Sequence, residues 1–442
     1  MRIGILLGLN PSDGGIYQYS LTMLEALREC KQSFPDDVFV TFSSPNQQLM
    51  ETLKGEGWSI IPLLPLTPQR RVMNLAERVA GPGLRQAVQR FRSRKATFAE
   101  TNSEARDLDK VQYNTEVESW FRANKVDLMI YPISTSLSFE ARIPYVFAVH
   151  DLQHRLQPHF PEVSAAGEWE TREYLFRNGI RNALFVLAES DVGKEDVMNF
   201  YGETGIQPDR VKVLPLLPST TLSSSITVEE QSKIRQRYAI PERYLFYPAQ
   251  FWPHKNHQRI IEALGSLRKR EGLEIPIVFC GSHSGKIRER TFDELMSVAR
   301  RLDVVKQIHY LGYVPDEDMS PLYAGAVALV MPTFFGPTNI PVLEAWQLNC
   351  PVISSDIRGI REQTGDAALL VAPDSVAAIA EGIRRLWTDA DLRRTLIEKG
   401  RARVQLFTLK DFGLRLTEIL KEAKAILTNG QAVNSSQRRG IR

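Results

Sequence analysis

The chain has 442 residues, more than one ordinary hydrophobic core organises, and this length predicts about two to three domains. Hydrophobic residues make up 43% of the chain and charged residues 24%, close to the average of globular proteins. Because 55 Lys and Arg stand against 52 Asp and Glu, the net charge is only +3, which argues against binding of nucleic acid through overall charge. No nucleic-acid partner is therefore expected.

Short apolar runs alternate with helix-length amphipathic segments along the chain. Most runs are apolar on both faces, the pattern of parallel strands covered by helices on either side. In the first half we expect strands at Arg2–Leu9, Asp37–Phe42, Ser59–Leu64, Val126–Ile133, Tyr145–Val149, Leu184–Ala188 and Val211–Leu216. In the second half we expect them at Tyr244–Pro248, Ile275–Cys280, Ile308–Leu311, Ala326–Met331, Pro351–Ser354 and Ala368–Val371. The pattern predicts an α/β protein with two doubly wound, Rossmann-like domains.

A Ser/Thr-rich stretch from Pro218 to Ser225 separates the two halves and is typical of a linker. We expect a first domain over residues 1–218, a linker over 219–240 and a second domain over 241–408. An amphipathic helix over 409–427 is expected to cross back to the first domain. The polar residues 428–442 are expected to form a disordered tail.

The N-terminal stretch MRIGILLGLN is short, is followed by Pro11 and lacks the basic region and cleavage site of a signal peptide. No run approaches about 18 apolar residues, so no membrane-spanning helix is expected. Three cysteines, Cys30, Cys280 and Cys350, lie far apart and fit neither a disulfide framework nor a zinc motif. These observations predict a cytoplasmic protein with buried, reduced thiols.

The segment Leu66–Lys95 departs from the alternating pattern. It holds eight basic residues and one acidic residue, Glu77, and its apolar residues Leu84, Val88 and Phe91 follow helical spacing. Such a helix is typical of peripheral contact with an anionic membrane surface. The alternative is a solvated helix whose apolar stripe packs on its own domain. Both interpretations of residues 66–95 stay open.

Ligands of open parallel sheets bind beyond the carboxyl ends of the strands, so the loops after strands are the candidate sites. The loop after the first strand contains Gly14 and Gly15, and paired glycines let a backbone approach a ligand. The alternative is a tight turn, and the absence of a G-x-G-x-x-G fingerprint argues against a dinucleotide. After the fifth strand stands His150, which we expect to bond a substrate hydroxyl or carbonyl as a neutral imidazole, or else to be structural. His154 and His159 follow without the spacing of zinc ligands.

Two loops of the second half carry charged side chains after a strand. Lys255 in QFWPHKNH precedes a helix, where an ammonium suits phosphate oxygens; a solvated lysine is the alternative. In FFGPTNIPVLEAW, Pro341 suits the first helical position and places Glu344 in the fourth. An acid there stabilises a helix by about 0.3–1 kcal/mol on its own. No capping box fits, so Glu344 is expected to accept bonds from sugar hydroxyls. Together the loops predict an interdomain cleft for a nucleotide diphosphate sugar.

At this point the residues resemble the family 4 glycosyltransferases, retaining enzymes of the GT-B fold. The resemblance covers nearly the whole chain and is carried by SDGGIYQY, VFAVHDLQ, YPAQFWPHKNH, VFCGS, LYAGAVALVMPTFFGPTNIPVLEAW and GDAALLVAP. It implies two Rossmann-like domains facing each other across a cleft, with the acceptor on the first domain and the nucleotide sugar on the second.

The resemblance also implies roles for single residues. Gly14 and Gly15 would lie near the donor phosphates, and His150 would contact the donor sugar. Lys255 would hold the diphosphate, and Glu344, the end of the family's E-x7-E motif, would hold the nucleotide ribose.

This sequence departs from the family's pattern at two positions. Gln250 stands where the family has an arginine, and Gly336 stands where the first glutamate of E-x7-E is expected. Backbone N–H groups over Pro337, Thr338, Asn339 and Ile340, with the Asn339 amide, would face the donor sugar in place of the missing glutamate. We interpret this as the altered donor site of a subgroup with GPTNIPVLE; a catalytically dead relative is the alternative.

The implied reaction moves a sugar, mannose by resemblance, from a nucleotide diphosphate to a hydroxyl of a glycan or lipid-linked acceptor, as in surface polysaccharide or lipopolysaccharide assembly. No carboxylate nucleophile stands in the expected place, which favours a front-face reaction with retention over double displacement. Asp316-Glu317-Asp318 has the D-x-D form of a metal motif but follows Pro315, so it predicts the charged first turn of a helix. No metal or other cofactor is expected.

Three other functions remain as alternatives. A nucleotide-sugar epimerase of the same fold would cleave the donor without an acceptor sugar. A non-catalytic sugar-nucleotide binding protein fits the missing glutamate and arginine. A Rossmann dehydrogenase fits least, because the phosphate fingerprint and its ribose-binding acid are absent.

Overall fold

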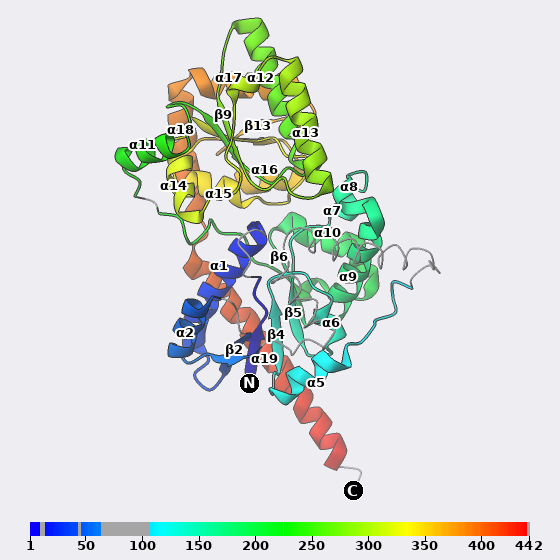
Figure 1. Cartoon of the computed structure of the whole chain (residues 1–442). Coiled ribbons are helices and arrows are strands. Elements are labelled where there is room, and N and C mark those ends of the chain that lie inside the picture. Colours follow the sequence, from blue (N-terminus) through cyan, green and yellow to red (C-terminus); the bar gives the residue numbers. More distant parts are fainter. Residues whose placement is uncertain (9–13, 43–45, 63–106, 224, 440–442) are drawn as a thin grey trace, which may run out of the picture.

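The computed structural model describes residues 1–8, 14–42, 46–62, 107–223 and 225–439. The predicted membrane-surface segment 66–95 lies outside these residues, and so do residues 10–13 of the glycine loop. Figure 1 shows two α/β domains, the second (green to orange) above the first (blue to teal). The loops that face between them are those in which the sequence predicts a site.

The first domain is built on a parallel sheet of strand order β3-β2-β1-β4-β5-β6-β7, seven strands within the described residues. The order runs outward in both directions from β1 and β4, so the topological switch point, where ligands of such sheets bind, lies between them. The strands are β1 (Arg2–Ile5), β2 (Val38–Phe42), β3 (Ser59–Ile61), β4 (Leu128–Tyr131), β5 (Tyr145–Val149), β6 (Phe185–Ala188) and β7 (Val211–Val213). The helices around them are α1 (Gly15–Cys30), α2 (Gln47–Gly55), α5 (Thr115–Ala123), α6 (Leu137–Glu140), α7 (Gln153–Leu156), α8 (Pro161–Ser164), α9 (Glu168–Asn182) and α10 (Asp191–Tyr201).

The second domain repeats this plan with the strand order β10-β9-β8-β11-β12-β13, again all parallel in the described part of the chain. Its switch point lies between β8 and β11. The strands are β8 (Leu245–Pro248), β9 (Ile277–Cys280), β10 (Ile308–Tyr310), β11 (Ala328–Met331), β12 (Val352–Ser355) and β13 (Leu369–Val371). The helices are α11 (Val228–Arg237), α12 (His257–Glu271), α13 (Lys286–Arg301), α14 (Asp316–Ala324), α15 (Ile340–Gln347), α16 (Arg358–Thr364), α17 (Val376–Thr388) and α18 (Ala390–Val404).

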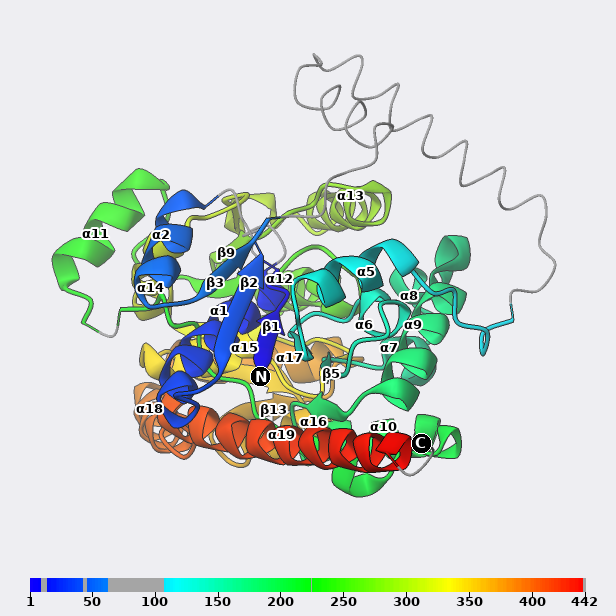
Figure 2. The ribbon, with the colours of Figure 1, turned by 90° about the horizontal axis from the view of Figure 1, so that it is seen from below.

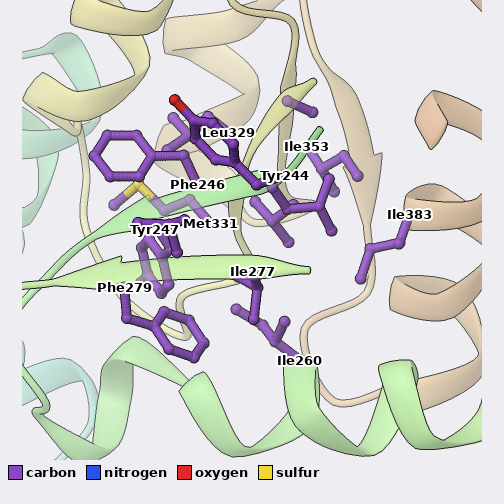
Figure 3. Close-up of a cluster of buried hydrophobic side chains, with 14 of the residues drawn as sticks. Tyr244, Phe246, Tyr247, Ile260, Ile277, Phe279, Leu329, Met331, Ile353 and Ile383 are labelled. Atoms are coloured by element: carbon purple, nitrogen blue, oxygen red, sulfur yellow. The ribbon is translucent and has the colours of Figure 1, made fainter. Parts of the chain in front are cut away.

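The core of the second domain fills both faces of its sheet. Figure 3 shows side chains of the central strands packed together, with Ile260 from α12 and Ile383 from α17 closing in from the helices. The single polar group of Tyr244 is satisfied, because its hydroxyl donates to the carbonyl of Leu322 at 2.8 Å. Rigid sheets of this kind hold the loops at their carboxyl ends in fixed positions.

The predicted fold class is confirmed, and each predicted strand has a counterpart in the structure. Several strands are shorter than predicted: the first ends at Ile5 rather than Leu9, where its parallel pairing with β2 also ends. The apolar run continues past β1 because Leu6 and Leu7 still pack against the two hydrophobic clusters of the first domain.

The second half of the predicted linker folds with the second domain. Thr227 and Glu230 form a reciprocal capping box at the start of α11. Ile234 on this helix and Ile240 after it are buried in the core of the second domain. The connecting chain without regular structure is therefore shorter than residues 219–240.

The last helix, α19 (Leu409–Arg439), returns to the first domain and runs along it, as Figures 1 and 2 show in red. Phe412, Leu416 and Leu420 are buried in the core of the first domain, against α1. The structure corrects the predicted helix end at residue 427, because the helix continues through the polar residues to Arg439. No proline stands in residues 428–439 to stop it.

Within the described residues, no helix is long and apolar enough to cross a membrane. Cys30, Cys280 and Cys350 are all buried and form no disulfide, as the sequence predicts.

Candidate active site

Loops of the two domains meet where the carboxyl ends of the two sheets face each other. The Gln157 side-chain amide donates to the carbonyl of Phe334 at 2.8 Å, and Arg358 pairs with Asp196 at 2.7 Å. Between these contacts lies a cleft of about 240 Å³. Its walls are the loop after β5 and the start of α10 in the first domain, and residues 334–337 and 357–359 in the second.

His150 lines this cleft, but both of its ring nitrogens are engaged within the first domain. Nδ1 lies 2.6 Å from Oε1 of Glu189, and Nε2 lies 2.7 Å from the carbonyl oxygen of Pro132. Because both partners are acceptors, each nitrogen carries a proton. Burial lowers the pKa of His150, but the hydrogen bond and charge of Glu189 outweigh burial, and the pKa lies above its usual value. The predicted neutral imidazole aimed at a substrate is therefore corrected to an imidazolium held by Glu189.

Glu189 links this histidine to the second domain. It directly follows β6, and its other oxygen, Oε2, accepts the hydroxyl of Thr338 at 2.7 Å. Glu189 is not among the predicted site residues, although a polar residue just after a predicted strand is the same signal that indicates His150. The result is a chain of hydrogen bonds from β4 through His150 and Glu189 to the predicted donor loop.

Lys255 lies in the loop after β8, beside the switch point of the second sheet. Its ammonium has no hydrogen bond or ion pair with any of the described residues. Burial lowers the pKa of Lys255 to about 8, against the opposing charges of Asp151 and Glu162 from the first domain. Both carboxylates have other partners: Asp151 pairs with Arg172 at 3.0 Å, and Glu162 lies 2.6 Å from Nδ1 of His254. A partly buried, unpaired cation of this kind is suited to hold an anion.

Gln250, five residues before Lys255, accepts two hydrogen bonds on its Oε1. One comes from the indole N–H of Trp252 at 3.0 Å, and the other from Nη1 of Arg288 at 2.6 Å. The guanidinium of Arg288 also lies over the Trp252 ring, 4.6 Å from its centroid. The positive charge of Arg288, a residue of α13, thus lies next to Gln250.

Gly336 has a backbone conformation that favours glycine, with φ +140°, and a Cβ there would lie 2.7 Å from Nδ2 of Asn339. The carboxamide of Asn339 therefore occupies the space beside the backbone where a side chain at 336 would begin. This Nδ2 is buried and has no hydrogen-bond partner among the described residues. The backbone of Asn339 is fixed separately, because its N–H donates to Gln363 and its carbonyl accepts from the same side chain.

The predicted row of backbone N–H groups over residues 337–340 is only partly available. Pro337 has no N–H, and that of Asn339 is used by Gln363 at 3.0 Å. Thr338 and Ile340 are the remaining candidates. Gly359 of α16 fixes this loop, because its missing Cβ lets the backbone of Pro337 pack directly on it, where a Cβ would lie 2.4 Å from the carbonyl oxygen.

Glu344 lies on α15 but is not free. The helix begins at Ile340 and Pro341 is its second residue, so Glu344 is one position further into the helix than predicted. The residue is 8% exposed, and its carboxyl accepts a hydrogen bond from the hydroxyl of Tyr323 at 2.6 Å. Burial raises the pKa of Glu344 to about 7, with a further contribution from Asp316. With that pKa, the carboxyl of Glu344 is protonated in part of the molecules near neutral pH.

The glycine loop approaches the same region from the first domain. Gly14 precedes α1 with φ +60°, and a Cβ on Gly15 would lie 3.8 Å from Cδ1 of Ile340. The predicted donor-site residues at the start of α1 and at the start of α15 are therefore neighbours across the two domains.

The remaining polar residues considered in the sequence lie on the surface or are bonded to other side chains. His154 is buried, with Nε2 3.0 Å from the hydroxyl of Tyr201, and His159 is exposed. Asp316, Glu317 and Asp318 form the first turn of α14, as predicted. Asp318 pairs there with Arg237 at 2.7 Å.

Comparison with known proteins relates this geometry to one family. Residues 230–403 match the family "Glycosyl transferases group 1", so the second half of the chain carries a glycosyltransferase group 1 domain. Among curated proteins, the O-antigen chain mannosyltransferase B of Escherichia coli is 26% identical over 249 residues, which are 56% of this chain and 63% of that protein. The D-inositol 3-phosphate glycosyltransferase of Corynebacterium glutamicum (strain R) is 22% identical over 417 residues, 93% of this chain and 92% of that protein.

Among solved structures, HepE of Anabaena in complex with UDP-glucose aligns with a TM-score of 0.64 at 18% identity, covering 96% of this chain and all of that one. At this identity the likeness establishes the shared fold, two Rossmann-like domains across a cleft.

Proposed function

We propose that this chain, with its glycosyltransferase group 1 domain over residues 230–403, transfers a sugar from a nucleoside diphosphate to an acceptor hydroxyl. The observation that carries the proposal is the ammonium of Lys255 at the switch point of the second sheet, which has no hydrogen-bond or ion-pair partner in the described residues. A diphosphate is the anion that this position suits, because the cation is partly buried and the loop after β11 lies directly beside it. The N–H of Phe334 in that loop donates to the carbonyl of His254 at 2.8 Å.

The donor sugar is proposed to lie between Lys255 and the cleft, against residues 336–340. Asn339 would then donate its buried Nδ2–H to a sugar hydroxyl, taking the place of the carboxylate that the family has at position 336. Glu344 is proposed to hold the ribose, exchanging its bond to Tyr323 or adding a second acceptor contact.

The proposed reaction retains the anomeric configuration and proceeds on one face. The bond from the anomeric carbon to the diphosphate oxygen breaks, the bond to the acceptor oxygen forms, and the acceptor proton passes to the departing diphosphate. In support, the carboxylates Asp151, Glu162 and Glu189 all have partners in the described site, so none of them is placed as a free nucleophile. Lys255 would stabilise the leaving diphosphate.

His150 is proposed to act through Glu189 and not on the sugar directly. Its Nδ1 bonds one carboxylate oxygen of Glu189, and the other oxygen of Glu189 holds Thr338 in the donor loop. This makes His150 a positioning residue in the proposed site.

A mannose-type donor and a glycan or lipid-linked acceptor of surface polysaccharide assembly are supported by the relative from Escherichia coli, whose name gives an O-antigen chain mannosyltransferase. We propose that the chain belongs to a subgroup with GPTNIPVLE, and the geometry of Gly336 and Asn339 supports this. Peripheral attachment through residues 66–95 is tested by sedimentation with anionic vesicles at low salt, where the full chain should sediment and should stay in solution with neutral vesicles.

The decisive experiment is a screen of nucleotide sugars by thermal shift, followed by NMR of the product formed with an acceptor. The expected product keeps the anomeric configuration of the donor. An inverted product would refute the retaining assignment, and sugar release or epimerisation that needs no acceptor would replace the transferase by an epimerase. Donor binding without any turnover would leave a sugar-nucleotide binding protein.

A further inference from the structure

We infer that Arg288 supplies the guanidinium that the donor-phosphate site lacks at position 250. This inference rests on the proposed function and adds one residue to it: a side chain from the first turn of α13 that binds the diphosphate together with Lys255. The position of Arg288 in the sequence gives no sign of this, because it lies within a helix and not directly after a strand.

The loops after β8 and β9 are in direct contact. Gly281, the first residue after β9, has φ +131°, and a Cβ there would lie 2.6 Å from the carbonyl oxygen of Ala249. The N–H of Phe251 donates to the carbonyl of Ser282 at 3.3 Å. The glycine thus lets the β9 loop lie against the segment that begins with Gln250, and α13 starts from there.

Arg288, in the first turn of α13, points back over this contact. Its Nη1 donates to Oε1 of Gln250 at 2.6 Å, and its guanidinium lies over the ring of Trp252 at 4.6 Å. The uncharged side chain of Gln250 is therefore in direct contact, at its carboxamide oxygen, with the positive charge of a residue 38 positions later in the chain. An arginine at position 250 would place its own guanidinium in the same neighbourhood.

The charge of Arg288 has no counter-ion in the part of the chain that the structure describes. No carboxylate pairs with it among the described residues, and its Nε is buried without a hydrogen-bond partner. Arg290, an exposed residue two positions further along the same helix, pairs instead with Glu294 at 2.7 Å. A partly buried guanidinium without a counter-ion is costly unless an anion binds.

A diphosphate is the anion that suits this geometry. Gln250 and Trp252 hold the guanidinium plane on one side of the loop, and Lys255 closes the same loop after one turn of 3-10 helix, Pro253–Lys255. A planar fork can bind two phosphate oxygens at once, while an ammonium acts as a point charge. The alternative role for Arg288 is to hold Trp252 in place and nothing more.

The test compares nucleoside diphosphate with nucleoside binding in the full-length protein. UDP and GDP are titrated by calorimetry, and the tighter of the two is carried forward with its nucleoside as the phosphate-free reference. Arg288→Gln should weaken the diphosphate about 10- to 100-fold, the effect of losing hydrogen bonds to a charged group, and leave the nucleoside unchanged. Arg290→Gln is the matched control and should change neither.

The double variant Gln250→Arg/Arg288→Gln moves the guanidinium to the other side of the contact and should regain most of the lost affinity. If a thermal melt shows that Arg288→Gln does not fold, Arg288→Lys replaces it, because lysine keeps the charge. Arg288→Lys should weaken binding of the diphosphate and leave binding of the nucleoside unchanged. Unchanged diphosphate binding in Arg288→Gln, or an equal loss for diphosphate and nucleoside, would overturn the inference. Wild-type protein that binds neither UDP nor GDP would instead overturn the proposed function, and the inference with it.

Discussion

The side chain of Asn339 stands where a side chain of residue 336 would have to begin: its Nδ2 would lie 2.7 Å from a Cβ on Gly336. The two positions are therefore coupled, and an acidic residue at 336 is incompatible with the present place of the Asn339 amide. The missing carboxylate and the buried amide are two aspects of one arrangement.

Gly336→Glu is consequently expected to lower turnover and stability instead of restoring a family pattern. The φ of +140° costs a non-glycine residue about 1–3 kcal/mol, and the new side chain must displace Asn339. Urea unfolding and donor-dependent kinetics measure the two effects. Gly312→Ala is the control for strain alone, since φ is +69° there and a Cβ would meet nothing within 4 Å. Higher turnover in Gly336→Glu at unchanged stability would contradict the coupling.

Glu344 should make the protein less stable as the pH rises from about 4.5 to 7. Burial raises its folded pKa to about 7, so the native state binds the proton more tightly than the unfolded chain does. The stabilisation is complete below the unfolded pKa and is lost as the pH passes the folded one; the shift corresponds to at most about 3 kcal/mol. Unfolding in urea at pH 5 and pH 7.5 measures this slope. Glu344→Gln should flatten it, and an identical slope in that variant would show that other groups cause it.

Lys255 should make diphosphate binding weaken above pH 8. Burial lowers the pKa of the free side chain to about 8, and a bound anion raises it again, so affinity is flat below pH 8 and falls towards tenfold per unit above it. Calorimetry with the tighter of UDP and GDP at pH 7, 8 and 9 measures the effect. Lys255→Gln should bind weakly at every pH with no such fall. Lys269→Gln, an exposed lysine at the other end of α12, should keep the wild-type profile.

The pKa of His150 should fall when Glu189 is neutralised. Burial by itself lowers that pKa, and only the hydrogen bond and charge of Glu189 bring it above the usual value. In Glu189→Gln, the ring should therefore lose its proton at lower pH than in the wild type. NMR titration of the His150 Cε1–H follows this, with the resonance of the exposed His159 as the internal reference. A midpoint that does not move would refute the imidazolium–carboxylate pair. In terms of stability, the contribution of the pair is complete below about pH 6.5 and is lost as the pH rises through the raised pKa.

The sequence predicted the sheets well because a buried parallel strand leaves a local signature. The run at Tyr145–Val149 is apolar at every position, and the structure has this strand with the same bounds. Post-strand loops could also be located, since the carboxyl ends of parallel strands share one edge of a sheet. That is why Gly15, Lys255 and Glu344 were found as candidates.

The pairings between loops could not be predicted, because they depend on which side chains meet across separate segments. Glu189 and Thr338 are 149 residues apart in the chain and meet only when the domains face each other. Arg288 reaches Gln250 only because a glycine brings two loops together. The sequence predicted a neutral, substrate-facing His150 for the same reason: its acceptors come from the ends of two other strands.

The return of α19 to the first domain also has a consequence for biosynthesis. Residues 409–423 complete a core whose other members lie in the first half of the chain, with Thr417 donating to the carbonyl of Gly413 beside Cys30. A ribosome makes the first sheet early, yet the apolar side of α1 stays uncovered until the last helix has left the exit tunnel. The domain that is translated first is thus the last to finish folding. A nascent chain stalled between the two halves would expose the apolar side of α1, to which chaperones can bind.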